Sequence, residues 1–201
     1  MQRILSALPA IRQTLLFSAT MPSEVLKLTK DFLRDPKFVQ VGRRGGGPAQ
    51  TISHAIQIVA KGQKVEWLAR WLRDVADGPV LVFCRTKIGA DRLASSLGRM
   101  GIRTAALHAD RTQQQRMSAV EGFRTGTYPV LVATDVAARG LDIDGIVHVV
   151  NFEVPNTPET YVHRVGRTGR AESTGSALTL VAPEEERALR ALEKAVGVQL
   201  Q

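Results

Sequence analysis

Short apolar runs alternate with helical patterns across residues 51–201, and this alternation constrains the fold more than any other feature of the sequence. The runs at 80–84 and 129–133 are continuous and of strand length, which is typical of strands covered on both faces. Strands that alternate with helices form parallel sheets, because each crossover returns the chain to the same edge of the sheet. The sequence therefore predicts an α/β fold, a doubly wound parallel sheet with helices on both faces.

The boundaries of these elements follow from apolar periodicity and from capping residues. Thr86 and Thr157 are placed to cap helices, and Gly197 is placed to end the last one. Strands are predicted at residues 52–59, 80–84, 104–107, 129–133, 146–150 and 177–181. Helices are predicted at 65–75, 86–101, 112–123, from 157 onward and at 183–197.

Residues 42–50 interrupt the pattern, because they include four glycines and a proline and have no apolar periodicity. Such a composition is typical of a linker. Before it we predict a strand at 14–17, a helix between Pro22 and Pro36, and a second strand at 38–41. The expected organisation is a segment 1–41, a linker 42–50 and a domain 51–201.

The charge of the chain is positive and unevenly distributed. It has 27 Lys and Arg against 19 Asp and Glu, a formal net charge of +8. Residues 1–103 hold 17 basic and 7 acidic side chains, whereas residues 104–201 hold 10 and 12. A polyanion such as a nucleic acid is an expected partner, although a solvated basic face would give the same counts.

Composition also excludes several classes of protein. The single cysteine, Cys84, excludes a disulfide framework and a Cys-rich zinc site, and it favours a reducing compartment. Because Cys84 lies in an apolar run, we interpret it as a core thiol rather than a nucleophile. His108 has no second ligand at a metal-binding spacing, so no metal site is expected. The sequence shows neither an apolar stretch of membrane-spanning length nor a secretory signal pattern, which predicts a cytoplasmic protein without a membrane partner.

The segment 163–170 is the most informative one for chemistry. Ligands of parallel sheets bind where the strands end, so the residues after each apolar run are candidates. In this segment Arg164, Arg167 and Arg170 recur at every third position, and glycine precedes the last two. Glycine lets the backbone approach a ligand, and the planar guanidinium binds phosphate oxygens with paired hydrogen bonds. A solvated helix end would explain the arginines but not the Gly-Arg repeat, so we predict a phosphate site.

A second segment, residues 133–142, follows a buried strand directly. Thr134 there offers a hydroxyl and a backbone N–H to a phosphate. Asp142, beside the flexible Gly140, is suited to accept a hydrogen bond from a ribose hydroxyl. A loop carboxylate that caps a backbone N–H is an equally good interpretation of Asp142 alone.

Together these segments resemble the DEAD-box RNA helicases of superfamily 2. Residues 163–170 resemble motif VI of that family and residues 133–142 resemble motif V. Ser18-Ala19-Thr20 resembles motif III, residues 80–86 resemble motif IV, and Gln113-Gln114-Gln115-Arg116 matches the Gln-x-x-Arg element. The set occurs in the family's order across nearly the whole chain. The sequence around motif IV is most similar to that of the bacterial RhlE-type subgroup.

The resemblance implies a fold and a distribution of ATP and RNA binding between two domains. Such helicases have two RecA-like domains, with ATP between them and RNA across both. This chain is similar to the second domain (51–201), preceded by the linker and by a C-terminal remnant of the first domain (1–41). The implied function is ATP-driven unwinding of RNA duplexes, with ATP and Mg²⁺ held mainly by the first domain.

The resemblance also assigns roles to single residues. It implies that Arg167 and Arg170 contact the γ-phosphate, with Arg170 as the arginine finger, and that Asp142 and Gly140 hold the ribose. RNA phosphates would be bound by Thr86, Arg116 and Thr134, with little sequence preference. Coupling between ATP, RNA and the first domain would involve Ser18, Thr20, Gln113, Arg139 and His163.

Two elements of the family are absent from the sequence. It contains no Gly-x-x-x-x-Gly-Lys-Ser/Thr phosphate loop and no acidic Mg²⁺-binding motif, so we expect the chain to be inactive alone. One alternative is a module that binds RNA or a helicase partner without catalysis. A weaker alternative is a DNA helicase of the wider superfamily.

Overall fold

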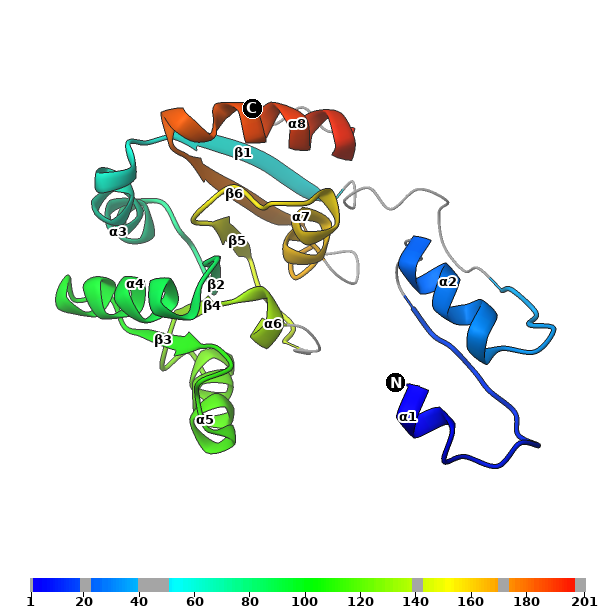
Figure 1. The fold of residues 1–201 in the computed structure, drawn as a ribbon. Helices are drawn as coiled ribbons and strands as arrows, with labels where there is room; N and C mark the ends of the chain where they lie inside the picture. The colour runs from blue at the N-terminus through cyan, green and yellow to red at the C-terminus, as the bar shows by residue number, and fades with distance from the viewer. Residues whose placement is uncertain (1, 19–22, 40–50, 139–142, 170–173, 198–201) are drawn as a thin grey trace. The chain divides into compact units, whose positions relative to one another are not determined.

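The structure is a computed structural model that describes residues 2–18, 23–39, 51–138, 143–169 and 174–197 (Figure 1). Its contacts divide the chain into two compact units, Met1–Gly46 and Gly47–Gln201. The smaller unit contains α1 (Gln2–Leu5) and α2 (Ser23–Phe32). The larger unit contains the sheet and the remaining helices.

The larger unit is built, in its described part, on one sheet of six strands in the order β1-β6-β5-β2-β4-β3. All neighbouring strands are parallel. The strands are β1 (Ile52–Ile58), β2 (Val80–Phe83), β3 (Thr104–Leu107), β4 (Val130–Ala133), β5 (His148–Asn151) and β6 (Gly175–Val181). Side chains of β2 and β4 are buried along their whole length, as the apolar runs predict.

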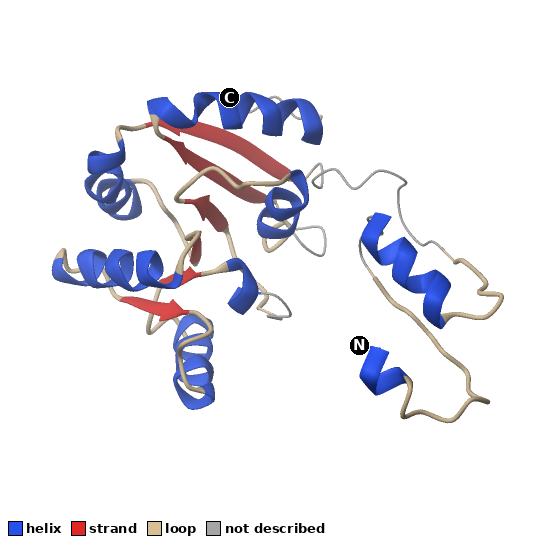
Figure 2. Cartoon of the chain, in the orientation of Figure 1, coloured by secondary structure: helices blue, strands red, loops and turns tan. Residues whose placement is uncertain are grey.

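Helices cover both faces of this sheet (Figure 2). Leu68 of α3 and Leu93 of α4 pack against one face. Phe123 of α5, Tyr161 of α7 and Leu189 of α8 pack against the other, together with α6. The helices are η1 (Lys61–Gln63), α3 (Lys64–Asp74), α4 (Lys87–Arg99), α5 (Gln113–Arg124), α6 (Asp135–Ala138), α7 (Pro158–Val165), η2 (Pro183–Glu185) and α8 (Glu186–Val196). The predicted α/β fold with helices on both faces is confirmed.

Polar side chains start several of these helices. The hydroxyl of Thr86 accepts a hydrogen bond from the Gly89 N–H at 3.0 Å, and that of Thr157 accepts one from the Thr160 N–H at 3.1 Å. Both predicted caps are therefore confirmed. Gly197, at φ 70°, ends α8 in the left-handed conformation that a side chain would disfavour.

The buried Lys64 joins α3 to the carboxyl ends of β5 and β6 and to η2. Its ammonium, 2% exposed, donates to the Phe152 and Leu180 carbonyl oxygens at 3.1 and 2.8 Å and to Glu185 Oε2 at 2.6 Å. Burial alone would raise the pKa of Glu185, but the hydrogen bond and charge of Lys64 hold that pKa below its ordinary value. The apolar periodicity of α3 gave no sign of this contact.

Neither of the two strands predicted before the linker is present in its described residues. Residues 14–17 have no regular structure, and the Phe17 side chain is 88% exposed. Residues 38 and 39 also lie outside any strand, while 40 and 41 lie outside the described residues. A strand needs a neighbour to pair its backbone groups, and the described part of the smaller unit has no second strand.

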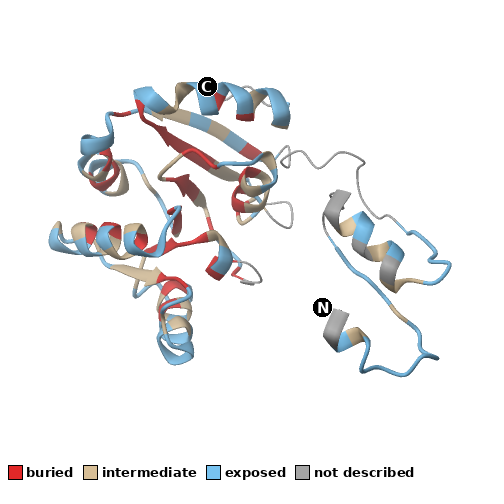
Figure 3. Cartoon of the chain, in the orientation of Figure 1, coloured by how far each residue is buried: buried red, intermediate tan, exposed pale blue. Residues whose placement is uncertain are grey.

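Burial is concentrated in the sheet and the helix surfaces that face it (Figure 3). Cys84 lies buried just after β2, and burial raises the pKa of its thiol, as a core thiol requires. In the part of the chain that the structure describes, no helix has the length and hydropathy needed to cross a membrane.

Candidate functional site

The order of the strands in the sheet reverses at β2. β3 and β4 lie on one side of β2, whereas β5 and β6 lie on the other. A crevice opens at such a switch point, beyond the ends of the strands. The segments that follow β2, β4 and β5 therefore meet there, and they carry Thr86, Thr134 and Glu153.

Arg164 is used inside the domain. Its Nε and Nη2 donate to the two carboxylate oxygens of Asp135 at 2.6 and 2.9 Å, and its Nη1 donates to Asn151 Oδ1 at 3.1 Å. The guanidinium is buried and lies 5.2 Å from the centre of the Phe83 ring. Because the sequence suggested that all three arginines of 163–170 face a ligand, this is a correction for the first of them. The ion pair joins α7 to the carboxyl end of β4.

The turn after α7, which carries Arg167, is held from two sides. The Thr168 hydroxyl, buried, donates to the Ile146 carbonyl oxygen at 2.6 Å. The Thr51 hydroxyl donates to the Gly169 carbonyl oxygen at 3.0 Å. Gly169 has φ +65°, and a Cβ there would lie 2.6 Å from the side chain of the first residue of β1. Only glycine permits this close approach of the turn to the sheet.

His163 and Arg167 line one small pocket at the carboxyl ends of β2 and β4. The pocket also has Phe83, Asp135, Ala138, Thr160 and Arg164 in its wall. Arg167 Nε donates to the His163 carbonyl oxygen at 3.3 Å, so the two predicted site residues lie on one turn. The other predicted residues of this region, Arg139, Gly140, Asp142 and Arg170, lie outside the described residues.

Thr86 and Thr134 follow the neighbouring strands β2 and β4. Thr86 exposes its side chain at the start of α4, where the first backbone N–H groups of the helix also point. Thr134 is buried, and its N–H donates to the Leu107 carbonyl oxygen at 3.1 Å. The expectation that this N–H is available to a phosphate is therefore wrong, because it belongs to the β3–β4 ladder.

Gln113 and Arg116 lie on the first turn of α5. They line a cavity of about 720 Å³ together with Leu107 and Met117. No acidic side chain of the described residues pairs with Arg116, and its Nε has no hydrogen-bond partner there. No described acid thus neutralises its charge.

Arg85 and Glu153 form a contact that the motifs did not indicate. The backbone N–H of Arg85 donates to Glu153 Oε2 at 3.2 Å, and its guanidinium lies 3.6 Å from Glu185. Burial raises the pKa of the Glu153 carboxyl, which Arg85, Lys64 and Arg164 only partly offset. The only sequence signal was the position of Arg85 directly after an apolar run.

The remaining predicted residues lie in the smaller unit. Ser18 is exposed there, and Thr20 lies outside the described residues. The two units are separate bodies, so the structure assigns no relation between Ser18 and the pocket at Arg167. Across the described residues, no group of three or more His, Cys, Asp or Glu side chains is placed to hold a metal ion.

Comparison with known proteins gives consistent matches. The profile of the helicase conserved C-terminal domain matches residues 63–172. The chain is 45% identical over 196 residues to the DEAD-box ATP-dependent RNA helicase CshA of Bacillus subtilis, covering 96% of the chain and 39% of that protein. It is 47% identical over 169 residues to the ATP-dependent RNA helicase DDX4 of Mus musculus, covering 84% of the chain and 24% of that protein. The chain thus spans about two fifths or less of these curated relatives.

Solved structures match over the same range. S. cerevisiae Dbp5 bound to RNA and ADP BeF3 is similar with a TM-score of 0.88 and 28% identity, over 99% of this chain and 53% of that one. A DEAD-box protein from Methanococcus jannaschii is similar with a TM-score of 0.70 and 35% identity, over 99% and 53%. The all-parallel sheet of six described strands is the RecA-like fold of these proteins.

Proposed function

Since the chain belongs to the family of helicase conserved C-terminal domains, in its DEAD-box branch, we propose that it forms the C-terminal part of an ATP-dependent RNA helicase. Residues 51–201 would be its second RecA-like domain, 42–50 the linker and 1–41 the end of the first domain. The observation that carries the proposal is the pocket at the carboxyl ends of β2 and β4, whose wall includes His163 and Arg167.

The charges around the pocket beside Arg167 favour a phosphate at its mouth. The acid in its wall, Asp135, is paired with Arg164, so the wall does not repel an anion. Arg167 and Arg170 would contact the γ-phosphate, with Arg170 as the finger that stabilises developing charge, and Asp142 with Gly140 would hold the ribose. Bound ATP supplies the phosphoryl group and Mg²⁺ neutralises its phosphates. We assign both mainly to the first domain, because the sequence here has no phosphate loop.

RNA would lie against the starts of α4 and α5. Helix N-termini attract phosphate, and both helices begin at this edge of the sheet. Arg116 supplies an uncompensated charge, while Thr86 and Thr134 supply hydroxyls. The contacts are to the sugar-phosphate backbone, which implies little sequence preference.

Coupling between the two ligands requires the first domain of the same protein. Ser18, Thr20, Gln113, Arg139 and His163 are assigned to that contact. The small unit exposes large apolar side chains such as Leu15 and Phe17, which a first domain would cover.

We place the protein in the cytoplasm. The residues around motif IV place it nearest the RhlE-type subgroup, although the relatives reported above have other names.

A chimera tests this function. The 196 matched residues of B. subtilis CshA are replaced by this chain, and separation of an RNA duplex is followed with and without ATP. We expect ATP-dependent separation, and none when Arg170→Ala is introduced. A folded chimera that binds RNA without separating duplexes would support the alternative, a non-catalytic RNA-binding or partner-binding module.

A further inference from the structure

The edge strand β3 has one side without a neighbour. Among the described strands it is the last of the sheet and pairs only with β4. The Thr134 N–H donates to the Leu107 carbonyl oxygen, so Leu107 and Ala105 turn their backbone groups toward β4. Because successive residues of a strand face opposite ways, Thr104 and Ala106 turn their N–H and C=O groups outward. No turn or loop bond in the described chain engages these groups.

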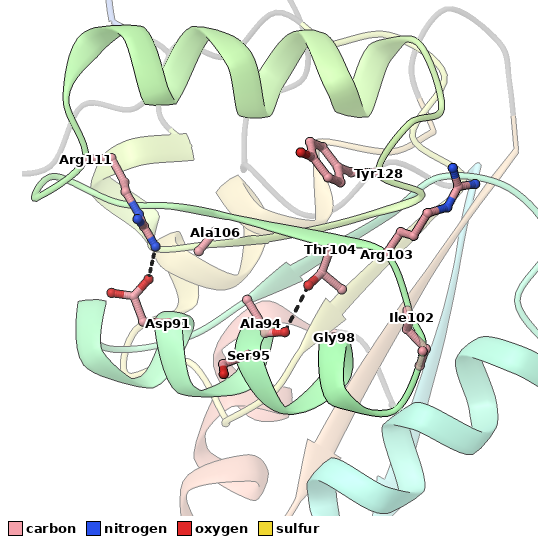
Figure 4. Close-up of a pocket in the computed structure, with 11 residues that line it drawn as sticks. Asp91, Ala94, Ser95, Gly98, Ile102, Arg103, Thr104, Ala106, Arg111 and Tyr128 are labelled. Atoms are coloured by element: carbon pink, nitrogen blue, oxygen red, sulfur yellow. Dashed lines mark hydrogen bonds and ion pairs between the residues drawn. The ribbon is translucent and has the colours of Figure 1, made fainter.

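A groove of about 570 Å³ runs along this side of β3 (Figure 4). One wall of the groove is α4, whose small residues Ala94, Ser95 and Gly98 leave the groove open on that side. On the other side lies Tyr128, whose ring fits over Gly122 of α5, where a Cβ would come within 2.5 Å of it. The groove therefore gives an extended chain access to the outward groups of Thr104 and Ala106.

The charges around the groove are basic on balance. Arg103 and Arg111 lie at its opposite ends (Figure 4). The one acid in its lining, Asp91, pairs with Arg111 and lies 2.9 Å from His108. Burial alone would raise the pKa of Asp91, but these hydrogen bonds hold it below its ordinary value. Arg103 is exposed, and no described side chain pairs with it.

We propose that this groove binds an acidic segment of a partner protein, which adds to β3 as an extra strand. An edge strand presents alternating donors and acceptors, and another backbone complements both, which is the basis of recognition by strand addition. A nucleic-acid phosphate offers acceptors alone. Because Asp91 pairs with Arg111, the exposed Arg103 at the other end is the charge that favours acidic side chains in the added strand. The site is distinct from the proposed ATP and RNA edge and does not depend on it.

Backbone NMR of the isotopically labelled chain tests the proposal. The probe is a short capped peptide of alternating valine and glutamate, and its counterpart contains lysine in place of glutamate. We expect the acidic peptide to shift the amides of Thr104 and Ala106 in a saturable way, and the lysine peptide to bind at least about tenfold more weakly.

Two variants make the test specific. Arg103→Glu changes an exposed side chain and should weaken the acidic peptide by about tenfold or more. Gly98→Leu should fill the groove and abolish binding while α4 persists, because a Cβ at Gly98 meets nothing within 4 Å. Gly62→Leu is the matched control, since Gly62 is equally open and lies in η1 outside the groove.

Several results would overturn the proposal. One is an acidic peptide that leaves the β3 amides unshifted. Another is a single-stranded RNA oligonucleotide that shifts these amides more strongly than the peptide, which would make the groove an RNA path. A third is concentration-dependent dimerisation that shifts the same amides without any peptide, which would make a second copy of the chain the occupant.

Discussion

The three arginines of residues 163–170 have different roles, although the sequence repeats them at equal spacing. Arg164 is buried against Asp135, whereas Arg167 lies in the wall of a pocket at the sheet edge. Removing one partner of a buried ion pair is costly, so Arg164 is needed to keep Asp135 paired, whereas the planar guanidinium of an arginine at a ligand edge suits a phosphate. The same residue type therefore serves structure at one position and, in our proposal, catalysis three positions later.

We expect Arg170→Ala to remove hydrolysis in the CshA chimera. An arginine finger contributes on the order of 10³ or more in rate, because it stabilises charge that develops only in the transition state. The variant should still bind RNA in the absence of ATP with nearly unchanged affinity. Phosphate release and RNA affinity, measured on the same preparation, check both statements. A variant that keeps more than about a tenth of the rate would show that Arg170 is not the finger.

Arg116→Ala should have the opposite effect on the two readouts. Loss of one phosphate contact should weaken RNA binding at all sequences and lower the salt slope by about one. Fluorescence anisotropy with a labelled RNA across a range of salt concentrations measures this slope. Arg190→Ala is the matched control, because Arg190 is an exposed arginine on α8 with only a 3.8 Å contact to Glu186. Equal slopes for both variants would remove Arg116 from the RNA site.

The sequence predicted the site better where the signal is local than where it depends on packing. The Thr86 cap and the shared turn of His163 and Arg167 follow from neighbouring residues. The Arg164–Asp135 pair and the use of the Thr134 N–H depend on which strands become neighbours, and no single segment encodes that. Arg85 and Glu153 were missed for the same reason, since they are 68 positions apart.

At the scale of elements, the strands and helices of residues 51–201 were largely predictable. Continuous apolar runs identified β2 and β4 because buried strands need apolar side chains on both faces. The same reasoning failed at 14–17, where the apolar pattern is present but no strand of the described residues pairs with it. A strand pattern thus predicts a strand only when the chain also supplies its neighbour.

Lys64 shows how one buried charge joins several elements, and Lys64→Met should reveal it. The variant leaves Glu185 and two carbonyl oxygens without their donor, so we expect a loss of about 3 kcal/mol in the free energy of unfolding. Chemical denaturation checks this value. Lys61→Met, an exposed neighbour in η1, should stay within about 0.5 kcal/mol of the parent.

The effect of Lys64→Met should also depend on pH. The pKa of Glu185 is held below its ordinary value of 4.5, so its ion pair stabilises the fold above that pH. The contribution is lost as the pH falls through the lowered pKa. The difference in stability between parent and variant should therefore be largest near neutral pH and shrink in acid. A difference that stays constant from neutral pH to below the lowered pKa would contradict this assignment.

At the scale of the whole molecule, our proposal gives this chain one side of the ATP site and the first domain the other. It has the arginine turn and the starts of α4 and α5, but its sequence contains no phosphate loop. It spans 39% of the length of CshA, whose remaining residues would supply the first domain in the chimera. We therefore propose that this chain completes a helicase site together with a first domain and does not form the whole site alone.

Steady-state phosphate release with saturating RNA tests that claim most directly, measured in parallel on the purified chain and on the CshA chimera. The phosphate loop and the acidic motif position the reacting phosphates, and phosphoryl transfer depends on that positioning. We expect no turnover above background from the chain alone and RNA-stimulated turnover from the chimera. Clear turnover from the chain alone, or a folded chimera that binds RNA and ATP without releasing phosphate, would contradict it.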